Sequence, residues 1–172
     1  MSEGKLLGFQ LWINMPAKSK MNKPEYLYIK NNQLGLYKDN EKIVKVIAGK
    51  FENAEGPEKG HNVEPIYFHV VLEKDKKFKC DVPVGHNSFI YLLAGDLSVG
   101  EDKHDKTGNS NLILLDRGDK LIVKANDRSE FLFIAGKPIG EPIARGGPFV
   151  MNTKAEIIEA VQDYHNGTFA KY

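Results

Sequence analysis

Histidines and one cysteine are the residues of this chain whose side chains could bind a metal or act as a nucleophile. The sequence contains five histidines, and Cys80 is the only cysteine. His69, His86 and Asp81 lie within one stretch, and imidazole with carboxylate is a donor set that suits iron and similar metals. A metal centre requires several ligands that converge on one point, whereas each of these histidines stands alone. We therefore expect hydrogen bonds to satisfy His69 and His86.

The remaining composition excludes several classes of protein. Cys80 has no evident basic partner in the sequence, so we expect a small buried apolar residue and not a nucleophile. A lone cysteine cannot form an internal disulfide, which fits a reducing compartment. The net charge of +1 excludes a strongly basic nucleic-acid binder, and no apolar run has the length of a membrane span. Residues 1–5 lack the apolar core of a signal peptide. A cytoplasmic protein without direct contacts to nucleic acid or membrane is predicted.

The candidate histidines precede a stretch that predicts a β-hairpin. The apolar run 89–94 ends at Gly95-Asp96, and Leu97 and Val99 alternate directly after it. Glycine permits the positive backbone angle that a tight hairpin turn requires. A strand–Gly-Asp–strand hairpin that is entered through a Pro/Gly bend, here residues 83–85, resembles the central hairpin of a cupin barrel.

Short strands separated by turn residues continue to residue 136 and predict an all-β fold, a single cupin-like jelly-roll (double-stranded β-helix) barrel. Two elements lie outside the barrel. Residues 8–16 alternate as an extra N-terminal strand, and Thr153 with Glu156 forms a capping box that begins one C-terminal amphipathic helix over residues 154–165. We divide the chain into an N-terminal strand and linker, residues 1–24, and a cupin domain, residues 25–172, which includes the helix.

Two long stretches resemble the pirin family. One is Gly8-Phe9-Gln10-Leu11-Trp12-Ile13-Asn14-Met15-Pro16, and the other runs from Phe131 through Gly146-Gly147-Pro148-Phe149 to Thr153. The likeness covers the whole chain but corresponds to the C-terminal cupin half of a typical pirin. The resemblance implies that full-length members contain two barrels, with one iron held by three histidines and a glutamate in the N-terminal barrel. It also implies oxidative cleavage of flavonols such as quercetin and, in animals, nuclear co-regulation of transcription. The nucleus is therefore the alternative compartment.

The iron ligands that this resemblance implies have no counterparts here. Counted back from the turn at Gly95, the first three ligand positions fall on Asp81, Pro83 and Asn87. Proline cannot bind a metal, and asparagine is a weak neutral ligand. A fourth ligand should follow Gly118, yet the chain has no histidine between residues 104 and 165. We therefore expect no metal ligands, no cofactor and no catalytic residues in this chain.

These observations favour a non-catalytic pirin-like cupin module that binds a partner protein or a small apolar ligand. The alternative is an iron-dependent flavonol (quercetin) dioxygenase of the pirin type, with iron held by a set such as His69, His86 and Asp81, or half of such an enzyme completed by another chain. A third interpretation is that the sequence is a piece of a longer pirin.

Two groups of residues follow from the preferred interpretation. The predicted ligand pocket is lined by six side chains, although one sequence does not settle which strand faces point inward: Tyr67, His69, His86, Phe89, Tyr91 and Phe133. The predicted interface uses the apolar residues of the first strand, because an exposed apolar strand offers itself to a homodimer partner or to a second cupin chain: Phe9, Leu11, Trp12 and Ile13.

Overall fold

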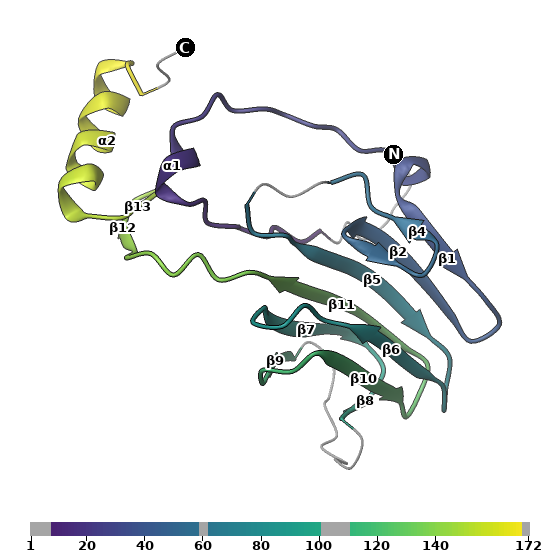
Figure 1. Ribbon diagram of the computed structural model, residues 1–172. Helices are drawn as coiled ribbons and strands as arrows, with labels where there is room; N and C mark the ends of the chain where they lie inside the picture. The colour runs from purple at the N-terminus through teal and green to yellow at the C-terminus, as the bar shows by residue number, and fades with distance from the viewer. Residues whose placement is uncertain (1–7, 59–61, 101–110, 170–172) are drawn as a thin grey trace. The chain divides into compact units, whose positions relative to one another are not determined.

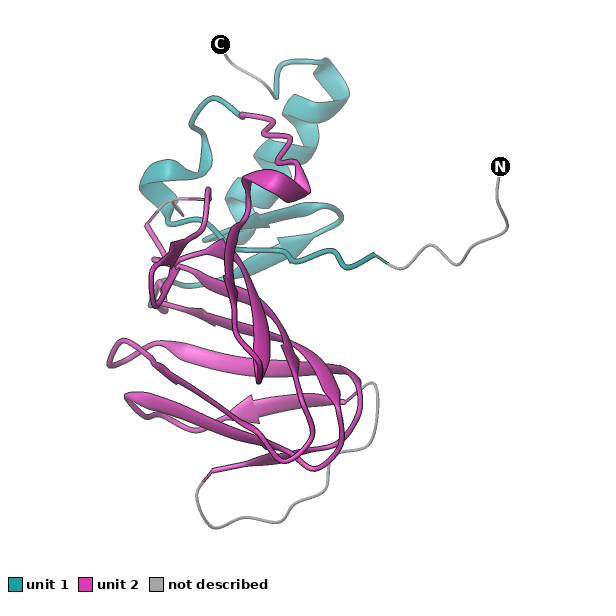
Figure 2. Ribbon diagram, turned by 90° about the vertical axis from the view of Figure 1, so that its right-hand side faces the viewer, with its two compact units in different colours: residues 1–24, 140–172 teal, residues 25–139 magenta. Residues whose placement is uncertain are grey.

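The structure is a computed structural model that describes residues 8–58, 62–100 and 111–169. Most of its ordered elements are strands, and the longest helix lies near the C-terminus (Figure 1). The chain forms two compact units, one of residues 1–24 and 140–172 and the other of residues 25–139 (Figure 2). None of the helices in the described part is long and apolar enough to cross a membrane.

The larger unit is built on two antiparallel sheets, both open. The six-stranded sheet has the order β1 (Gly35–Lys38), β2 (Lys42–Ala48), β5 (Ile66–Leu72), β11 (Ser129–Gly136), β7 (Asn87–Ala94) and β9 (Leu112–Leu115). The three-stranded sheet has the order β6 (Lys77–Asp81), β10 (Lys120–Ala125) and β8 (Leu97–Val99). A two-residue hairpin, β3 (Lys50–Phe51) and β4 (Ala54–Glu55), and a short 3-10 helix, Asn31–Gln33, complete the unit.

The core of this unit lies between the inner faces of the two sheets. Burial alternates strictly along β5, where Ile66, Phe68, Val70 and Leu72 are buried and the residues between them are partly exposed. That period of two is expected of a strand with one face in the core. The buried residues of β10 and β6 join the same apolar cluster, so the two sheets share one core. The predicted all-β fold with a single C-terminal helix is confirmed. Both sheets are open, so the predicted barrel is not closed; the two sheets and their shared core are called the barrel below.

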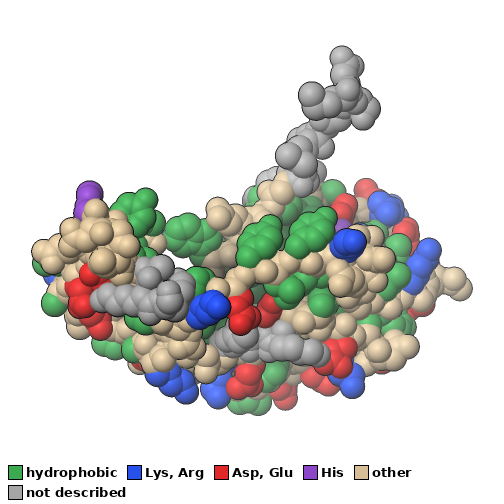
Figure 3. All heavy atoms as spheres, turned by 90° about the horizontal axis from the view of Figure 1, so that it is seen from above, with side chains coloured by type: hydrophobic (Ala, Val, Ile, Leu, Met, Phe, Trp, Pro, Cys, Tyr) green, Lys and Arg blue, Asp and Glu red, His purple; other side chains and the backbone are tan. Residues whose placement is uncertain are grey.

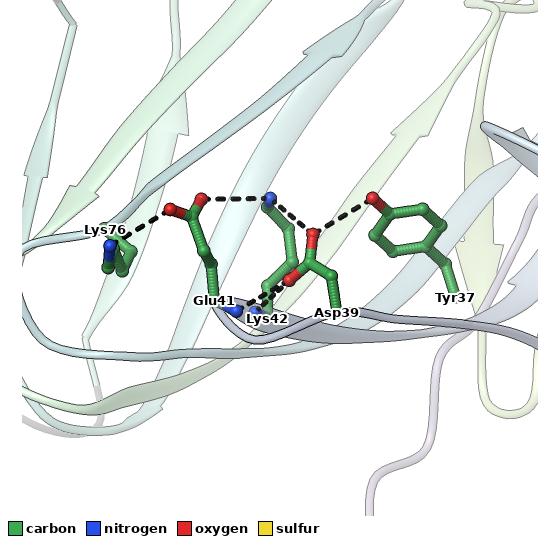
Figure 4. A network of polar contacts seen from close by, with 5 residues as sticks. All are labelled: Tyr37, Asp39, Glu41, Lys42 and Lys76. Carbon is green, nitrogen blue, oxygen red and sulfur yellow. Dashed lines mark hydrogen bonds and ion pairs between the residues drawn. The ribbon is translucent and has the colours of Figure 1, made fainter.

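The turn between β1 and β2 is held by a polar network (Figure 4). The Asp39 carboxylate accepts hydrogen bonds from the backbone N–H groups of Glu41 and Lys42, both at 2.7 Å, and from Tyr37 Oη at 3.0 Å. Burial opposes ionisation of Asp39, but these hydrogen bonds and that from Lys42 Nζ outweigh it and lower its pKa to about 2. Lys76 pairs with Glu41 at 3.0 Å and thereby extends the network.

The smaller unit contains α1 (Ala17–Lys20), the hairpin β12 (Ala144–Gly146) and β13 (Phe149–Met151), and α2 (Lys154–Asn166). The capping box predicted for α2 is confirmed. Thr153 Oγ1 accepts a hydrogen bond from the Glu156 backbone N–H, and the Glu156 carboxylate accepts one from the Thr153 backbone N–H at 2.7 Å. Gly146 allows β12 to approach the helix, because a Cβ there would lie 2.4 Å from Ile157 Cγ2.

The predicted N-terminal strand is not present. Residues 8–16 form no strand, and Pro16 is the N-cap of the short helix α1. A strand exists only where a neighbouring strand satisfies its backbone groups, and among the described residues none pairs with this segment. Directly after this segment, the Ala17 backbone N–H donates to Glu141 Oε2 at 2.8 Å, and Asn152 Nδ2 donates to the same oxygen at 2.8 Å, so α1 is tied to the rest of the smaller unit.

Candidate functional site

The bend between β6 and β7 holds the three positions at which metal ligands were sought. Asp81, Pro83 and Asn87 are all exposed to solvent. Asp81 ends β6, and the Val82 backbone N–H that follows donates to the Asp119 carbonyl at 2.8 Å. These positions are therefore accessible to solvent and lie outside the packed core.

His86 is the one buried histidine among the described residues, with a relative exposure of 5%. Its Nε2 lies 3.2 Å from the Glu64 carbonyl, which can only accept, so Nε2 carries the proton and donates. Its backbone N–H donates to the Pro83 carbonyl at 3.1 Å. Nδ1 is buried and has no hydrogen-bond partner among the described residues. His86 thus ties the bend after β6 to the loop before β5.

His69 has a different neighbour and a different position. Its Nε2 lies 2.6 Å from Glu130 Oε1 on the outer face of the six-stranded sheet. His69 is paired with Leu132 on β11, whereas Asn87, next to His86, is paired with Gly136. Four residues along a strand correspond to roughly 13 Å, which is too far for the two rings to share a metal.

The interior of the barrel is filled by aromatic rings. Phe51 stacks on Phe78 with ring centroids 5.2 Å apart, and Phe78 meets Phe131 edge to face at 5.7 Å. Phe51 also contacts Phe68 at 5.7 Å, and Phe68 contacts Phe133 at 6.1 Å. All five rings are buried and belong to one hydrophobic core cluster. The interior is a packed core.

A cavity of about 750 Å³ lies at the end of the barrel where β6 ends. Its walls include Asp81 and Pro83 together with Glu55, Glu58 and Glu64, and Lys50 is its only cationic lining residue among those described. No three histidine, cysteine or carboxylate side chains in the described part of the chain gather closely enough to hold a metal ion, the set His69, His86 and Asp81 included. The cavity therefore has an acidic rim but no ligand set for iron.

The sequence predicts that Cys80 is a buried apolar residue, and the structure shows it partly buried. Its side chain packs against the core cluster from β6. Burial, and to a smaller extent the charge of Asp81, raises the pKa of the thiol to about 12. A thiol with so high a pKa is a poor nucleophile at neutral pH.

The six residues predicted to line one pocket are divided between two faces of the six-stranded sheet. Phe133 lies on the inner face, within the core. Tyr67, His69, Phe89 and Tyr91 are partly exposed and alternate with buried neighbours, which places them on the outer face. His86 lies in the bend before β7. The six do not enclose a common cavity, because residues on opposite faces of a strand point away from each other.

The four predicted interface residues are exposed, but only two of them line the same groove. Relative exposures are 46% for Phe9, 37% for Leu11, 62% for Trp12 and 49% for Ile13. Trp12 and Ile13 line a groove of the smaller unit, in which Phe9 and Leu11 take no part. Large hydrophobic side chains also reach the surface elsewhere, as the view in Figure 3 illustrates.

The fold and sequence place the chain among cupin-like proteins. A family model of the pirin C-terminal cupin domain matches residues 67–170, more than half of the chain. The solved structure of a quercetin 2,3-dioxygenase from Acinetobacter baumannii superposes with a TM-score of 0.82 at 32% identity, over 92% of this chain and 55% of that one. A pirin-like protein of Caulobacter vibrioides is 35% identical over 97% of this chain and 60% of its own length, and human pirin is 34% identical over 96% and 58%.

The chain therefore belongs to the pirin family. It spans somewhat more than half the length of the relatives it matches. The iron that the family resemblance implies does not fit the residues present. One expected ligand position is a proline, all three are exposed, and phenylalanine rings occupy the interior.

Proposed function

We propose that this chain is a non-catalytic cupin module of the pirin family, which binds a ligand or partner and does not convert a flavonol. The observation that supports this most directly is the barrel interior, which Phe51, Phe68, Phe78, Phe131 and Phe133 fill. An ion placed among such rings would lose its hydration without gaining ligands, which is strongly unfavourable. A dioxygenase site needs the opposite arrangement, with converging imidazole and carboxylate groups around an open position.

The test is to measure metal content and flavonol turnover on the full chain. The protein is loaded with ferrous iron under anaerobic conditions, dialysed, and assayed by elemental analysis and by loss of quercetin absorbance in air. We expect far less than one iron per chain and no loss of quercetin above that of a His86→Gln, His69→Gln variant. One tightly held iron per chain, with turnover that this double variant abolishes, would contradict the proposal.

A second candidate function is half of a flavonol dioxygenase that another chain completes. The likeness to a solved quercetin 2,3-dioxygenase, at a TM-score of 0.82 and 32% identity, favours it. Under this alternative the iron ligands come from residues that this chain does not contain. Iron and quercetin turnover would then appear only after a second, ligand-bearing chain is added, and they would follow its amount.

The partner that we propose for the module is a second cupin domain, from another copy of this chain or from a different chain. Phe9 and Leu11 support this, because they are large apolar side chains at the surface, outside the groove that Trp12 and Ile13 line. Since residues 8–16 form no strand, association would cover side chains and would not complete a sheet. Covering each such side chain contributes roughly 1.5–3 kcal/mol if burial is complete.

A further inference from the structure

The smaller unit contains a groove that brings together the two stretches by which the sequence resembles the pirins. Its volume is about 730 Å³, within the range of pockets that bind small molecules. One wall comes from the N-terminal segment and α1, and the other from β12, the hairpin turn, β13 and the residues after α2. The lining residues that carry the argument are Trp12, Asn14, Lys20, Arg145, Phe149 and Phe169.

The groove is fixed by contacts of its own unit. Glu141 accepts hydrogen bonds from both walls, from the Ala17 backbone N–H and from Asn152 Nδ2, each at 2.8 Å. Phe149 packs against Phe169 with ring centroids 5.0 Å apart and against Tyr164 of α2 at 6.0 Å. The walls are therefore held by hydrogen bonds and ring contacts before any ligand arrives, which lowers the entropic cost of binding.

The chemistry of the lining is apolar and aromatic with positive charge only. Trp12, Phe149 and Phe169 supply aromatic surface. Lys20 and Arg145 are the charged lining residues, and no carboxylate of the described part lines the groove. Flat rings with nearby cations suit a ligand that has an aromatic body and an anionic group.

Neither cation forms an ion pair with a residue that the structure describes. Lys20 Nζ donates to the uncharged Asn14 Oδ1 at 2.5 Å. Its field also helps to lower the pKa of Glu156, but the larger causes there are the hydrogen bonds with Thr153 that cap α2. Arg145 is exposed on β12 and forms no ion pair with any residue that the structure describes. Its guanidinium can therefore form two parallel hydrogen bonds with an incoming carboxylate.

We propose that this groove binds a small aromatic carboxylate, with the ring between Trp12 and Phe149 and the carboxylate on Arg145. The site is separate from the barrel, and it goes beyond the proposed function, because it does not depend on whether the barrel is catalytic.

The sole tryptophan of the chain provides the readout. Trp12 is 62% exposed in the groove, so a ¹⁵N-labelled sample gives a single indole N–H signal that reports on this site alone. The probe is 2-naphthoate, and the matched neutral probe is 2-naphthamide, which has the same ring system without the charge. We expect the indole signal to shift in a saturable way with 2-naphthoate and at least about fivefold more weakly with 2-naphthamide, since a charge-assisted hydrogen bond is roughly twice as strong as a neutral one.

Arg145→Gln should weaken 2-naphthoate binding by about five- to tenfold. The expected loss of affinity is kept this small because solvent screens an ion pair with an exposed arginine. Arg145→Glu should abolish it while the affinity for 2-naphthamide stays the same. Arg117→Gln, which removes an exposed arginine of the other unit, is the matched control and should have no effect. Two results would each overturn the proposal: equal affinity for both probes, or equal weakening by the Arg117 and Arg145 variants.

Discussion

Truncation of Phe131 to alanine tests whether the barrel interior is a packed core or an open site. The Phe131 ring is fully buried on β11 and contacts Phe78 of the opposite sheet edge to face at 5.7 Å. A buried phenylalanine removes about 150–250 Å² from water, which corresponds to roughly 4–6 kcal/mol at 25 cal/mol/Å². Alanine retains part of that area and neighbouring side chains relax into part of the space. We therefore expect the free energy of unfolding to fall by about 3–5 kcal/mol.

The assay is equilibrium urea unfolding, followed by circular dichroism, of wild type, Phe131→Ala and the control Phe89→Ala. Phe89 lies on the outer face of the same sheet and is partly exposed, so its truncation should cost less than half as much. A loss below about 1 kcal/mol for Phe131→Ala would refute the reasoning, because a ring that borders empty space has few contacts to lose.

Three further predictions concern the turn network, the cysteine and association. Asp39→Asn should lower the free energy of unfolding above pH 4 by about 1–2 kcal/mol, a value discounted for the partial exposure of the side chain. Urea unfolding should show the difference in stability between wild type and variant disappearing as the pH falls from 3.8 towards 2, because the wild-type carboxylate then also becomes neutral. Cys80 should react with iodoacetamide at pH 8 at least about a hundredfold more slowly in the folded than in the urea-unfolded chain, since burial raises its pKa to about 12. Sedimentation should show self-association that Phe9→Ser, Leu11→Ser weakens and that Leu114→Ser, an equally apolar exposed control, leaves unchanged.

Local signals in the sequence predicted the elements that depend on neighbouring residues. The Thr153–Glu156 capping box and the left-handed Gly167 define the ends of α2, because each acts through the backbone of its own helix. Gly95 has a φ of 91° and lies in the predicted turn between β7 and β8, but these two strands belong to different sheets and do not pair, so the predicted hairpin does not form. These features involve only residues close in the chain, which explains why one sequence is enough.

Non-local features were not predictable in the same way. The alternation of apolar and other side chains in residues 9–14 indicates an extended segment with two different faces. It does not show whether a partner strand exists, and none does among the described residues. The inward face of β5 and β7 was also ambiguous, because Tyr67, Phe89 and Tyr91 are as apolar as their buried neighbours. The groove around Trp12 and Arg145 joins residues more than a hundred positions apart, and no local pattern indicates such a meeting.

A metal centre needs several converging ligands, and the packed core supplies none, which leads to a prediction about restoring the site. The variant Asp81→His, Pro83→His, Asn87→Glu places ligand types at all three expected positions, yet we expect it to bind iron no better than wild type after dialysis. The three positions are exposed, the aromatic rings of the core offer no ligand group, and no fourth histidine follows Gly118 on a described strand. Elemental analysis measures the iron content of the variant, and the quercetin assay measures its turnover. Pro83→Ala is the control, because it removes the proline from the bend without adding a ligand. One iron per chain in the triple variant would show that ligand identity alone had been missing, and that the packed interior is not what prevents iron binding.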